Sequence, residues 1–319
     1  MKRMLINFSV VCTSFLIGLV FAETALRLIN SSGTNYDIEM WRYSKELKIK
    51  SSNIKLGHEH SKSHSALLQN VNIRTNSFGM RGPEPKENYD RRILFLGSSI
   101  TMGWGVKEED VFTTIIEKKF KSDGFQVDIL NSGVGNYNAE RYVENFFSNL
   151  KVLKPNDIVI HYFINDAEIL ENSNGNFITR NFQLGVIGWR ALNQIFGSIE
   201  KTSLEDYYKS LYSENSQTFI RMKASLEKIL EYTQKQNINL YLSIVPDIHN
   251  LENYPFYDIH DKMELLANKN NIPFINFIDE FKKIPASKLW NLTNDPHPNM
   301  IGHQVMADQL YPILMHFNK

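Results

Sequence analysis

The chain passes from a predicted strand into a turn at residues 95–103, which read Phe95-Leu96-Gly97-Ser98-Ser99-Ile100-Thr101-Met102-Gly103. Here an apolar strand runs directly into small, flexible residues ahead of a helical pattern, and such a turn can hold a serine hydroxyl clear of a sheet. It is not a phosphate-binding loop, because no Lys-Ser/Thr pair follows Gly103. It is also not G-x-S-x-G, because Thr101 occupies the last glycine position. The turn alone does not assign a nucleophile.

Short apolar segments alternate with helical patterns on the carboxyl side of Arg91. The sequence predicts strands over 93–96, 127–130, 158–160, 240–245 and 274–277, and helices over 108–121, 139–153, 217–236, 260–269 and 302–315. Short strands that are mostly apolar are typical of a parallel sheet covered on both faces. Strand–helix alternation implies right-handed crossovers. We therefore expect an α/β fold with a doubly wound parallel sheet and with its sites at the carboxyl ends of the strands.

Composition and charge exclude several classes of protein. The chain has 319 residues, and 35 Lys+Arg against 35 Asp+Glu leave a formal charge of zero, which argues against a general nucleic-acid binder. With 42% hydrophobic and 22% charged residues, it has the composition of a globular protein with a sizeable core. The single cysteine, Cys12, excludes an intrachain disulfide and a Cys-rich zinc module.

The N-terminus carries a candidate membrane segment. Lys2 and Arg3 precede an uncharged run over residues 4–22, which at about 1.5 Å per residue approaches the length that crosses a ~30 Å hydrocarbon layer. Basic residues on the leading side place that end in the cytoplasm. We expect a single-pass anchor, with the chain after Glu23 extracytoplasmic and on the periplasmic side in a Gram-negative cell. A cleaved signal peptide is the alternative, because residues 20–22 resemble a cleavage site.

The sequence divides into three parts. Residues 1–29 form the predicted anchor or signal peptide, 30–90 a membrane-proximal arm, and 91–319 the α/β domain. The arm is polar and irregular, apart from a possible helix over 36–47. It ends in the helix-breaking stretch Arg81-Gly82-Pro83-Glu84-Pro85. We expect much of the arm to pack on the domain.

Polar blocks stand at three further places in the α/β pattern. Asn131-Ser132-Gly133-Val134-Gly135-Asn136-Tyr137 follows the second strand, Phe163-Ile164-Asn165-Asp166 the third, and Asn294-Asp295-Pro296-His297-Pro298-Asn299 precedes the last helix. With the turn at 97–103, these blocks resemble, in order, those of the SGNH (GDSL-like) hydrolase superfamily, in a membrane-anchored divergent subgroup. The resemblance covers about residues 91–319. It implies a three-layer flavodoxin-like sheet, the SGNH hydrolase fold, and ester chemistry.

The resemblance implies a catalytic triad. Ser99 matches the family's nucleophile and His297 matches the base that takes its proton. A serine hydroxyl needs such a base, and the pKa of histidine suits the task at neutral pH. The family usually has Asp three residues before the histidine, where this chain has Asn294. Asp295, two residues before His297, is therefore the expected acid that orients the imidazole, and Asp166 is the first residue to test in its place.

The resemblance also implies an oxyanion hole. The backbone amide of Ser99 and the side chain of Asn165 match two of the family's donors. The third would be a backbone amide in the glycine block, at Gly133, Gly135 or Asn136. Each pre-oriented donor is worth roughly 10²–10³ in rate.

The sequence indicates no metal site and no cofactor. His58, His60 and His64 are spaced loosely like metal ligands, but no acidic or cysteine cluster accompanies them. We expect surface histidines in the arm.

The stretch 172–203 is long and unusually apolar for a crossover. It begins just after Asn165 and Asp166. One interpretation is a helix packed on the core or on the arm, and the other is a lid or membrane-facing flap beside the site.

These features favour a membrane-anchored, extracytoplasmic serine ester hydrolase or O-acyltransferase that forms an acyl-enzyme on Ser99. The expected substrate is a small-molecule or glycan ester, with acyl groups of a cell-envelope glycan or lipid most in keeping with an anchored enzyme, and no nucleic acid is expected as a partner. Two departures from the family blocks, Ser98 for Asp and Phe163 for Gly, motivate an alternative. In that alternative the chain is a non-catalytic binding or assembly protein of the cell envelope.

Overall fold

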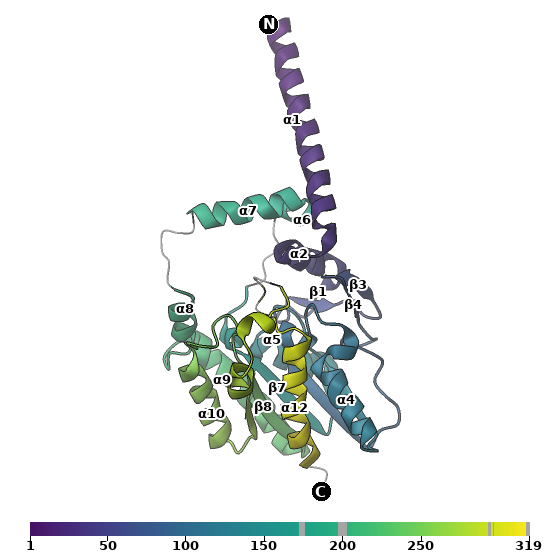
Figure 1. The fold of residues 1–319 in the computed structure, drawn as a ribbon, viewed down its shortest axis with the longest axis vertical. Helices are drawn as coiled ribbons and strands as arrows, with labels where there is room; N and C mark the ends of the chain where they lie inside the picture. The colour runs from purple at the N-terminus through teal and green to yellow at the C-terminus, as the bar shows by residue number, and fades with distance from the viewer. Residues whose placement is uncertain (172–175, 197–202, 293–294, 296, 317–319) are drawn as a thin grey trace.

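The computed structural model describes residues 1–171, 176–196, 203–292, 295 and 297–316. A long helix, α1 (Lys2–Ile29), stands away from the rest of the molecule, the arm lies at its foot, and the α/β domain lies beyond the arm (Figure 1). The candidate site forms where the arm meets the domain.

The α/β domain is built on a parallel sheet of 5 strands in the order β6-β5-β7-β8-β9. The strands are β5 (Arg91–Gly97), β6 (Val127–Asn131), β7 (Asp157–Phe163), β8 (Asn239–Val245) and β9 (Phe274–Asn276). Counted within the domain, this order is 2-1-3-4-5, the flavodoxin-like doubly wound arrangement. Every residue of β5, β6 and β7 is buried, as expected of strands covered on both faces. The prediction of a doubly wound parallel α/β sheet is confirmed.

Helices cover both faces of this sheet and make it the middle of three layers (Figure 1). On one side α4 (Phe112–Ser122) packs against α12 (Met300–His316), and on the other α5 (Ala139–Asn145) packs against α9 (Gln217–Gln236). The remaining domain helices are α3 (Ser99–Met102), α8 (Leu204–Leu211), α10 (Tyr257–Lys269) and α11 (Ile278–Lys282). The helix predicted over 139–153 is shorter, because α5 passes into a π-helical turn (Phe146–Leu150) and a 3-10 turn (Lys151–Leu153).

Two buried ion pairs join the strands at the edge opposite the site. Arg91 at the start of β5 pairs with Asp157 at the start of β7, and the side-chain Nη2 to Oδ1 distance is 2.8 Å. Arg92 pairs with Asp128 on β6 at 2.6 Å. Breaking one partner of such a pair leaves an uncompensated buried charge, so these contacts hold the strands in register.

The arm folds into a helix and two small hairpins. Helix α2 (Tyr36–Glu46) is followed by β1 (Lys48–Lys50) paired with β2 (His58–His60), and by β3 (Ser65–Leu68) paired with β4 (Val71–Arg74). The loop between β3 and β4 is Gln69-Asn70, with φ of 48° and 60°. Two positive φ angles are those of a type I′ turn, whose twist matches a hairpin.

The apolar side of the arm packs on the α/β domain. Tyr43, Leu47, Leu68 and Ile73 of the arm form one buried cluster with Met102 and Trp104, which belong to the domain. The arm therefore rests on the segment that follows Ser99, at the carboxyl edge of the sheet.

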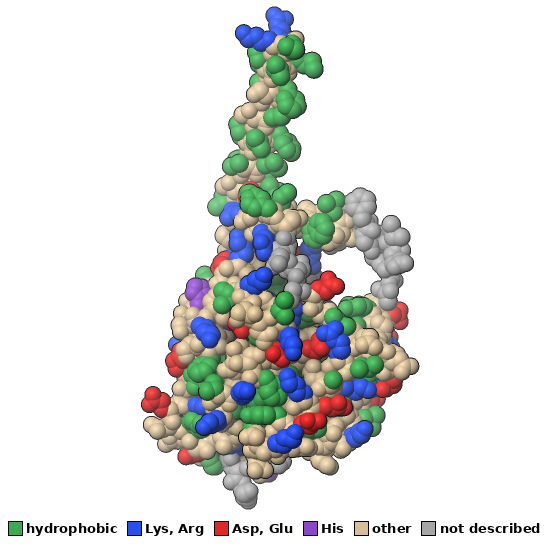
Figure 2. All heavy atoms as spheres, turned by 180° about the vertical axis from the view of Figure 1, so that it is seen from behind, with side chains coloured by type: hydrophobic (Ala, Val, Ile, Leu, Met, Phe, Trp, Pro, Cys, Tyr) green, Lys and Arg blue, Asp and Glu red, His purple; other side chains and the backbone are tan. Residues whose placement is uncertain are grey.

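Helix α1 is long and apolar enough to cross a membrane, a test that a signal sequence near an N-terminus also passes. Figure 2 shows apolar side chains along its length and the basic pair Lys2 and Arg3 at its free end. Two further helices, α6 (Phe177–Asn181) and α7 (Gln183–Phe196), lie beside its foot. In Figure 1, α7 runs across the axis of α1.

Candidate active site

Ser99, His297 and Asp295 form a hydrogen-bonded relay. Ser99 is the first residue of α3, directly after β5, and its Oγ lies 2.7 Å from Nε2 of His297. Nδ1 of the same imidazole lies 2.5 Å from Oδ1 of Asp295, and the backbone amide of His297 donates to that oxygen at 3.0 Å. Asp295 and His297 are buried, at 1% and 5% exposure. Asn294, which stands at the family's usual acid position, lies outside the described residues.

The second carboxylate oxygen of Asp295 is held by the arm. Nε2 of Gln69 donates to Oδ2 of Asp295 at 3.0 Å, and Oε1 of Gln69 accepts from Nδ2 of Asn291 at 2.8 Å. Both oxygens of the buried carboxylate therefore have partners, and its plane is fixed from two sides. Nothing in the sequence signals this role for Gln69, because the residue lies in an arm hairpin outside the family blocks.

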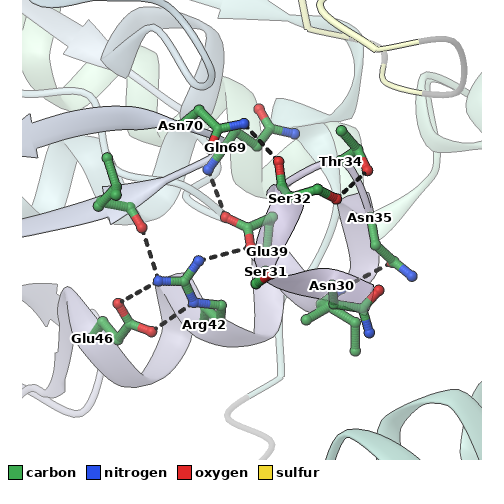
Figure 3. Close-up of polar contacts among 12 residues, drawn as sticks. Asn30, Ser31, Ser32, Thr34, Asn35, Glu39, Arg42, Glu46, Gln69 and Asn70 are labelled. Carbon is green, nitrogen blue, oxygen red and sulfur yellow. Dashed lines mark hydrogen bonds and ion pairs between the residues drawn. The ribbon is translucent and has the colours of Figure 1, made fainter. Parts of the chain in front are cut away.

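The position of Gln69 is fixed in turn by α2 (Figure 3). Oε2 of Glu39 accepts the backbone N–H of Gln69 at 2.6 Å, and Glu39 is fully buried. Arg42 pairs with the other oxygen of Glu39 at 2.9 Å and with Glu46 at 2.8 Å. Asp295 is thus linked, through Gln69 in the turn between β3 and β4, to the ion pairs that Arg42 makes on α2.

A second arm contact fixes the glycine block. The backbone N–H of Gly135 donates to the hydroxyl of Tyr43 at 2.8 Å, and this hydroxyl lies 2.7 Å from Nε2 of His60. Nδ1 of His60 lies 3.0 Å from the carbonyl of Gly79. A consistent chain of donors requires neutral His60 protonated on Nδ1. A Cβ on Gly135 would stand 2.6 Å from the Tyr43 ring, so only glycine fits there.

A third arm contact fixes the loop after the nucleophile. Arg81 is buried and its guanidinium donates to the carbonyls of Met102 at 2.8 Å, Gly103 at 2.5 Å and Val106 at 2.5 Å. Burial lowers the pKa of Arg81 to about 10. In the sequence, Arg81 is visible only as part of a helix-breaking stretch. In the structure, Arg81 holds the loop that follows α3.

The three candidate amides of the glycine block differ in what they bind. The N–H of Gly133 donates to Oδ1 of Asn131 at 3.0 Å, and that of Gly135 is taken by Tyr43. Among the described residues, no hydrogen bond from the Asn136 amide is found, and Asn136 is exposed with φ of 63°. The Ser99 amide, at the first position of α3, likewise has no partner within that part of the chain. Asn136 is therefore the member of the block whose amide is free to receive a ligand.

Asn165 and Asp166 follow β7 in a 3-10 turn and have different surroundings. Asn165 is half-buried, and its Oδ1 is buried without a partner in the described structure. Asp166 is buried, and its Oδ2 accepts the Phe163 amide at 3.1 Å. Burial raises the pKa of Asp166 well above its usual range, against a hydrogen bond from Ser98 that lowers it. The hydrogen bonds described for Asp166 do not reach His297, so Asp295 alone occupies the acid position within the described residues.

The histidines of the arm are not all on the surface, and that expectation was wrong for His60. It is 2% exposed, and burial lowers its pKa to about 3. His58 is half-buried, and its Nε2 contacts the carbonyl of Gly135 at 3.0 Å. His64 is exposed. Within the described ranges, no group of three or more His, Cys, Asp or Glu side chains is placed to hold a metal ion.

Comparisons with known proteins give distant likenesses. No protein-family model and no curated protein matches the sequence. The α/β hydrolase LAE5 from the metagenome of Lake Arreo, Spain, aligns with a TM-score of 0.48 at 14% identity over 72% of this chain and 98% of its own. The acetyl xylan esterase AlAXEase aligns with a TM-score of 0.45 at 20% identity over 70% of this chain and 99% of its own. The acetylxylan esterase Axe2 of Geobacillus stearothermophilus aligns with a TM-score of 0.46 at 16% identity over 70% of this chain and 94% of its own. Likenesses of this size do not decide an activity, which must be argued from the side-chain geometry.

Proposed function

We propose that the chain is a serine hydrolase acting on ester bonds, with Ser99 as nucleophile, His297 as general base and Asp295 as its orienting acid. The observation that supports this most directly is the relay itself, with 2.7 Å from Ser99 Oγ to His297 Nε2 and 2.5 Å from His297 Nδ1 to Asp295. Both distances lie within hydrogen-bonding reach, as proton transfer from a nucleophile to its base requires.

The reaction follows from these positions. Ser99 Oγ attacks the ester carbonyl carbon while its proton moves to Nε2 of His297, and Asp295 stabilises the resulting imidazolium. The C–O bond to the alcohol then breaks, and the alcohol leaves with the proton held by His297. Water then attacks the carbonyl carbon of the acyl-enzyme while His297 takes a proton from it. The bond to Ser99 Oγ breaks, the proton returns to Ser99, and the carboxylic acid product is released. An acceptor alcohol in place of water would give O-acyl transfer by the same steps.

The oxyanion of the tetrahedral intermediate is assigned three donors under this proposal. They are the backbone amides of Ser99 and Asn136 and the side-chain amide of Asn165. The two backbone amides have no hydrogen-bond partner among the described residues, which supports their assignment. Gly133 then lets the block approach α3, where a Cβ on Gly133 would stand 2.2 Å from the Met102 nitrogen, and Gly135 lets the block approach Tyr43 of the arm.

We further propose that α1 anchors the enzyme in a membrane, with residues 30–319 outside the cytoplasm and with acyl groups of a cell-envelope glycan or lipid as substrate. The support is the uncharged, exposed run of α1 after Lys2 and Arg3. Protease added to intact spheroplasts should digest the chain beyond Glu23 while the protein stays with carbonate-washed membranes. A soluble product that begins at Glu23 would show a cleaved signal peptide instead.

The hydrolase assignment is tested with p-nitrophenyl acetate and a fluorophosphonate probe on the full-length chain in detergent. Wild type should turn over the ester and take the label, and Ser99→Ala should do neither. Ser98→Ala is the matched control, because it removes a neighbouring hydroxyl that bonds Asp166 instead of His297. Absence of turnover and labelling in folded wild type would favour the non-catalytic binding protein. Labelling that persists in Ser99→Ala but disappears in Ser98→Ala would move the nucleophile.

A further inference from the structure

Helix α7 has two unlike sides. At 100° per residue, Gln183, Val186, Ile187 and Arg190 fall on one side of the helix, and Leu184, Trp189 and Leu192 fall on the other, with Asn193 at the boundary beside Trp189. Trp189 is 56% exposed and Leu192 49% exposed. A helix with large apolar side chains left in solvent on one side requires a partner for that side.

The side of α7 that carries Gln183 and Arg190 faces the arm. Arg190 forms an ion pair with Asp37 on α2, and burial raises the pKa of the adjacent Tyr36 to about 12 although the charge of Arg190 acts to lower it. Trp41 on α2 donates through Nε1 to the carbonyl of Thr179 on α6 at 2.8 Å. Because Arg190 faces α2 of the arm, the opposite side of α7, which carries Leu192 and is flanked by Trp189, is turned away from the arm.

The N-terminus of α7 is fastened to α1 by one buried carboxylate. Glu23, 9% exposed, accepts the backbone amides of Gln183 at 3.0 Å and Leu184 at 2.9 Å. Arg27 pairs with Glu23 at 2.7 Å and donates to the carbonyl of Asn181 at 3.1 Å. A carboxylate at this position satisfies two of the orphan amides of a helix start and complements its dipole.

Glu23 also marks the height at which α1 leaves a hydrocarbon layer. It is the first charged residue after the run 4–22, which spans about 28 Å at 1.5 Å per residue, close to the ~30 Å of a bilayer core. A charged group is costly inside that core, so Glu23 belongs at its edge. The residue that ends the membrane run is thus the residue that caps α7, and α7 runs across α1 from that point (Figure 1).

We propose that α6 and α7, residues 176–196, form an interfacial unit that lies on a phospholipid bilayer with its apolar side at the boundary between headgroups and acyl chains. The proposal rests on the membrane anchoring by α1 proposed above. The exposed apolar residues of α6 and the link between the helices extend the same surface, with Phe177 at 72%, Ile178 at 58% and Phe182 at 40% exposure. An amphipathic helix lying in the plane of the interface binds in this manner.

This placement brings the candidate site close to the bilayer. Asp37, which pairs with Arg190, is next in sequence to Tyr36, and the Tyr36 ring centroid lies 6.1 Å from that of His297. Two adjacent residues of α2 thus join the interfacial unit to the general base. An amphiphilic ester held in the outer leaflet is the substrate class that such a position suits.

The test places an environment-sensitive fluorophore on single cysteines of the full-length chain in phosphatidylcholine–phosphatidylglycerol vesicles, with Cys12→Ser as background. Leu192→Cys and Trp189→Cys carry the fluorophore on the apolar side, and Ile187→Cys is the control on the side of the helix that faces the arm. We expect a shift to shorter wavelength and quenching by lipid-borne spin labels at 189 and 192, with no lipid quenching at 187. Equal, water-like signals at all three positions would overturn the proposal.

Two further measurements separate the possible causes of failure. A label at Leu16→Cys reports on α1, so a lipid signal at 16 with water signals at 189 and 192 refutes the interfacial unit alone, whereas water at every position refutes the anchoring as well. A signal at 192 that appears only as the protein-to-lipid ratio rises would assign the apolar side to a second copy of the chain and overturn the proposal. The measurement involves no turnover, so failure of the Ser99 chemistry would not alter it.

The role of Glu23 is tested by Glu23→Ala. Removing the carboxylate leaves two α7 amides without their partner, so the label at 192 should lose its lipid quenching by several-fold while the label at 16 keeps its own. Unchanged quenching at 192 in this variant, with an unchanged circular dichroism spectrum, would overturn the docking of α7 by Glu23.

Discussion

The carboxyl edge of the sheet and the arm meet at the candidate site, and they contribute different kinds of group. The loops after β5, β6 and β7 and the loop before α12 hold the groups assigned to chemistry, such as Ser99 and His297. The arm holds none of these and instead bonds to their supports, through Gln69 to Asp295, Tyr43 to Gly135 and Arg81 to the loop after α3. The groups assigned to chemistry and the contacts that hold them in place therefore come from separate stretches of chain.

The largest effect should come from the sheet edge. Asp295→Asn keeps the shape of the side chain but removes the charge that stabilises the imidazolium, and should lower kcat by up to ~10⁴. His297→Ala should cost at least as much, and the double variant little more, since triad members act as a unit. Steady-state kinetics on p-nitrophenyl acetate measure all three. A near-normal kcat for Asp295→Asn would remove this residue from the triad.

The next effect belongs to the arm and appears in stability. Arg81→Met removes the donors that satisfy three buried carbonyls, and leaving buried groups unpaired costs about 1–3 kcal/mol each before relaxation. We expect a loss of roughly 3 kcal/mol in the free energy of unfolding, measured in urea. Arg74→Met is the control, because Arg74 makes an exposed ion pair with Glu108 that should contribute little. Equal losses in the two variants would show that Arg81 does not hold the loop.

Acid should weaken both regions through their buried histidines. Burial lowers the pKa of His60 in the arm and of His161 in β7 to about 3 in each case. Between pH 6.5, the usual pKa of histidine, and about 3, the unfolded chain binds protons that the folded chain does not, so stability falls as the pH falls.

The share of the arm in this acid effect can be measured. At pH 4.5 each histidine whose pKa is lowered to about 3 reduces the free energy of unfolding by up to about 2.7 kcal/mol. His60→Gln cannot take up that proton, so its unfolding free energy should fall less between pH 7 and 4.5 than that of the wild type. Identical pH dependence in the two proteins would show that His60 is not held neutral.

The smallest expected effect is that of Gln69→Leu, which tests whether Gln69 positions Asp295. Gln69→Leu removes one hydrogen bond to Asp295 and should lower kcat by about tenfold, or ~1.4 kcal/mol, with KM little changed. The pH profile of kcat/KM should also move, because Asp295 with one free oxygen interacts differently with the imidazolium. Gln69→Glu would place a second carboxylate beside Asp295 and should be worse than Leu. A loss confined to thermal stability, with an unmoved pH profile, would leave Gln69 a purely structural role.

The two regions also differ in how far the sequence alone could describe them. The sheet edge was predictable because each of its groups lies in a short block next to a strand, and the pattern of apolar strands places those blocks at one edge. Helix α9 has the predicted bounds, Gln217–Gln236, because its apolar spacing is regular and Ser216 caps it. The helix predicted over 139–153 was too long, because spacing does not reveal the π-helical turn that interrupts α5.

The arm contacts depend on pairings that no local pattern encodes. Tyr43 and Gly135 are 92 residues apart, and Gln69 and Asp295 are 226 apart. His60 was expected at the surface because a histidine between polar neighbours gives no sign of burial, and its burial depends on contacts with Tyr43 and with the turn at Gly79. Which glycine-block amide is free was likewise decided by the arm, since Tyr43 occupies the amide of Gly135.

The contact between Gln69 and Asp295 has a consequence for the order in which the enzyme is made. The chain emerges from the ribosome with its amino end first, so the arm can fold, and under the proposed anchoring α1 can enter the membrane, while the last polar block is still unsynthesised. Asp295 is synthesised 226 residues after Gln69, and only then can the turn between β3 and β4 receive its partner. Under the function and anchoring proposed above, a nascent or C-terminally truncated chain would be anchored but chemically silent, and reactivity toward fluorophosphonate would report that the chain has been made as far as His297.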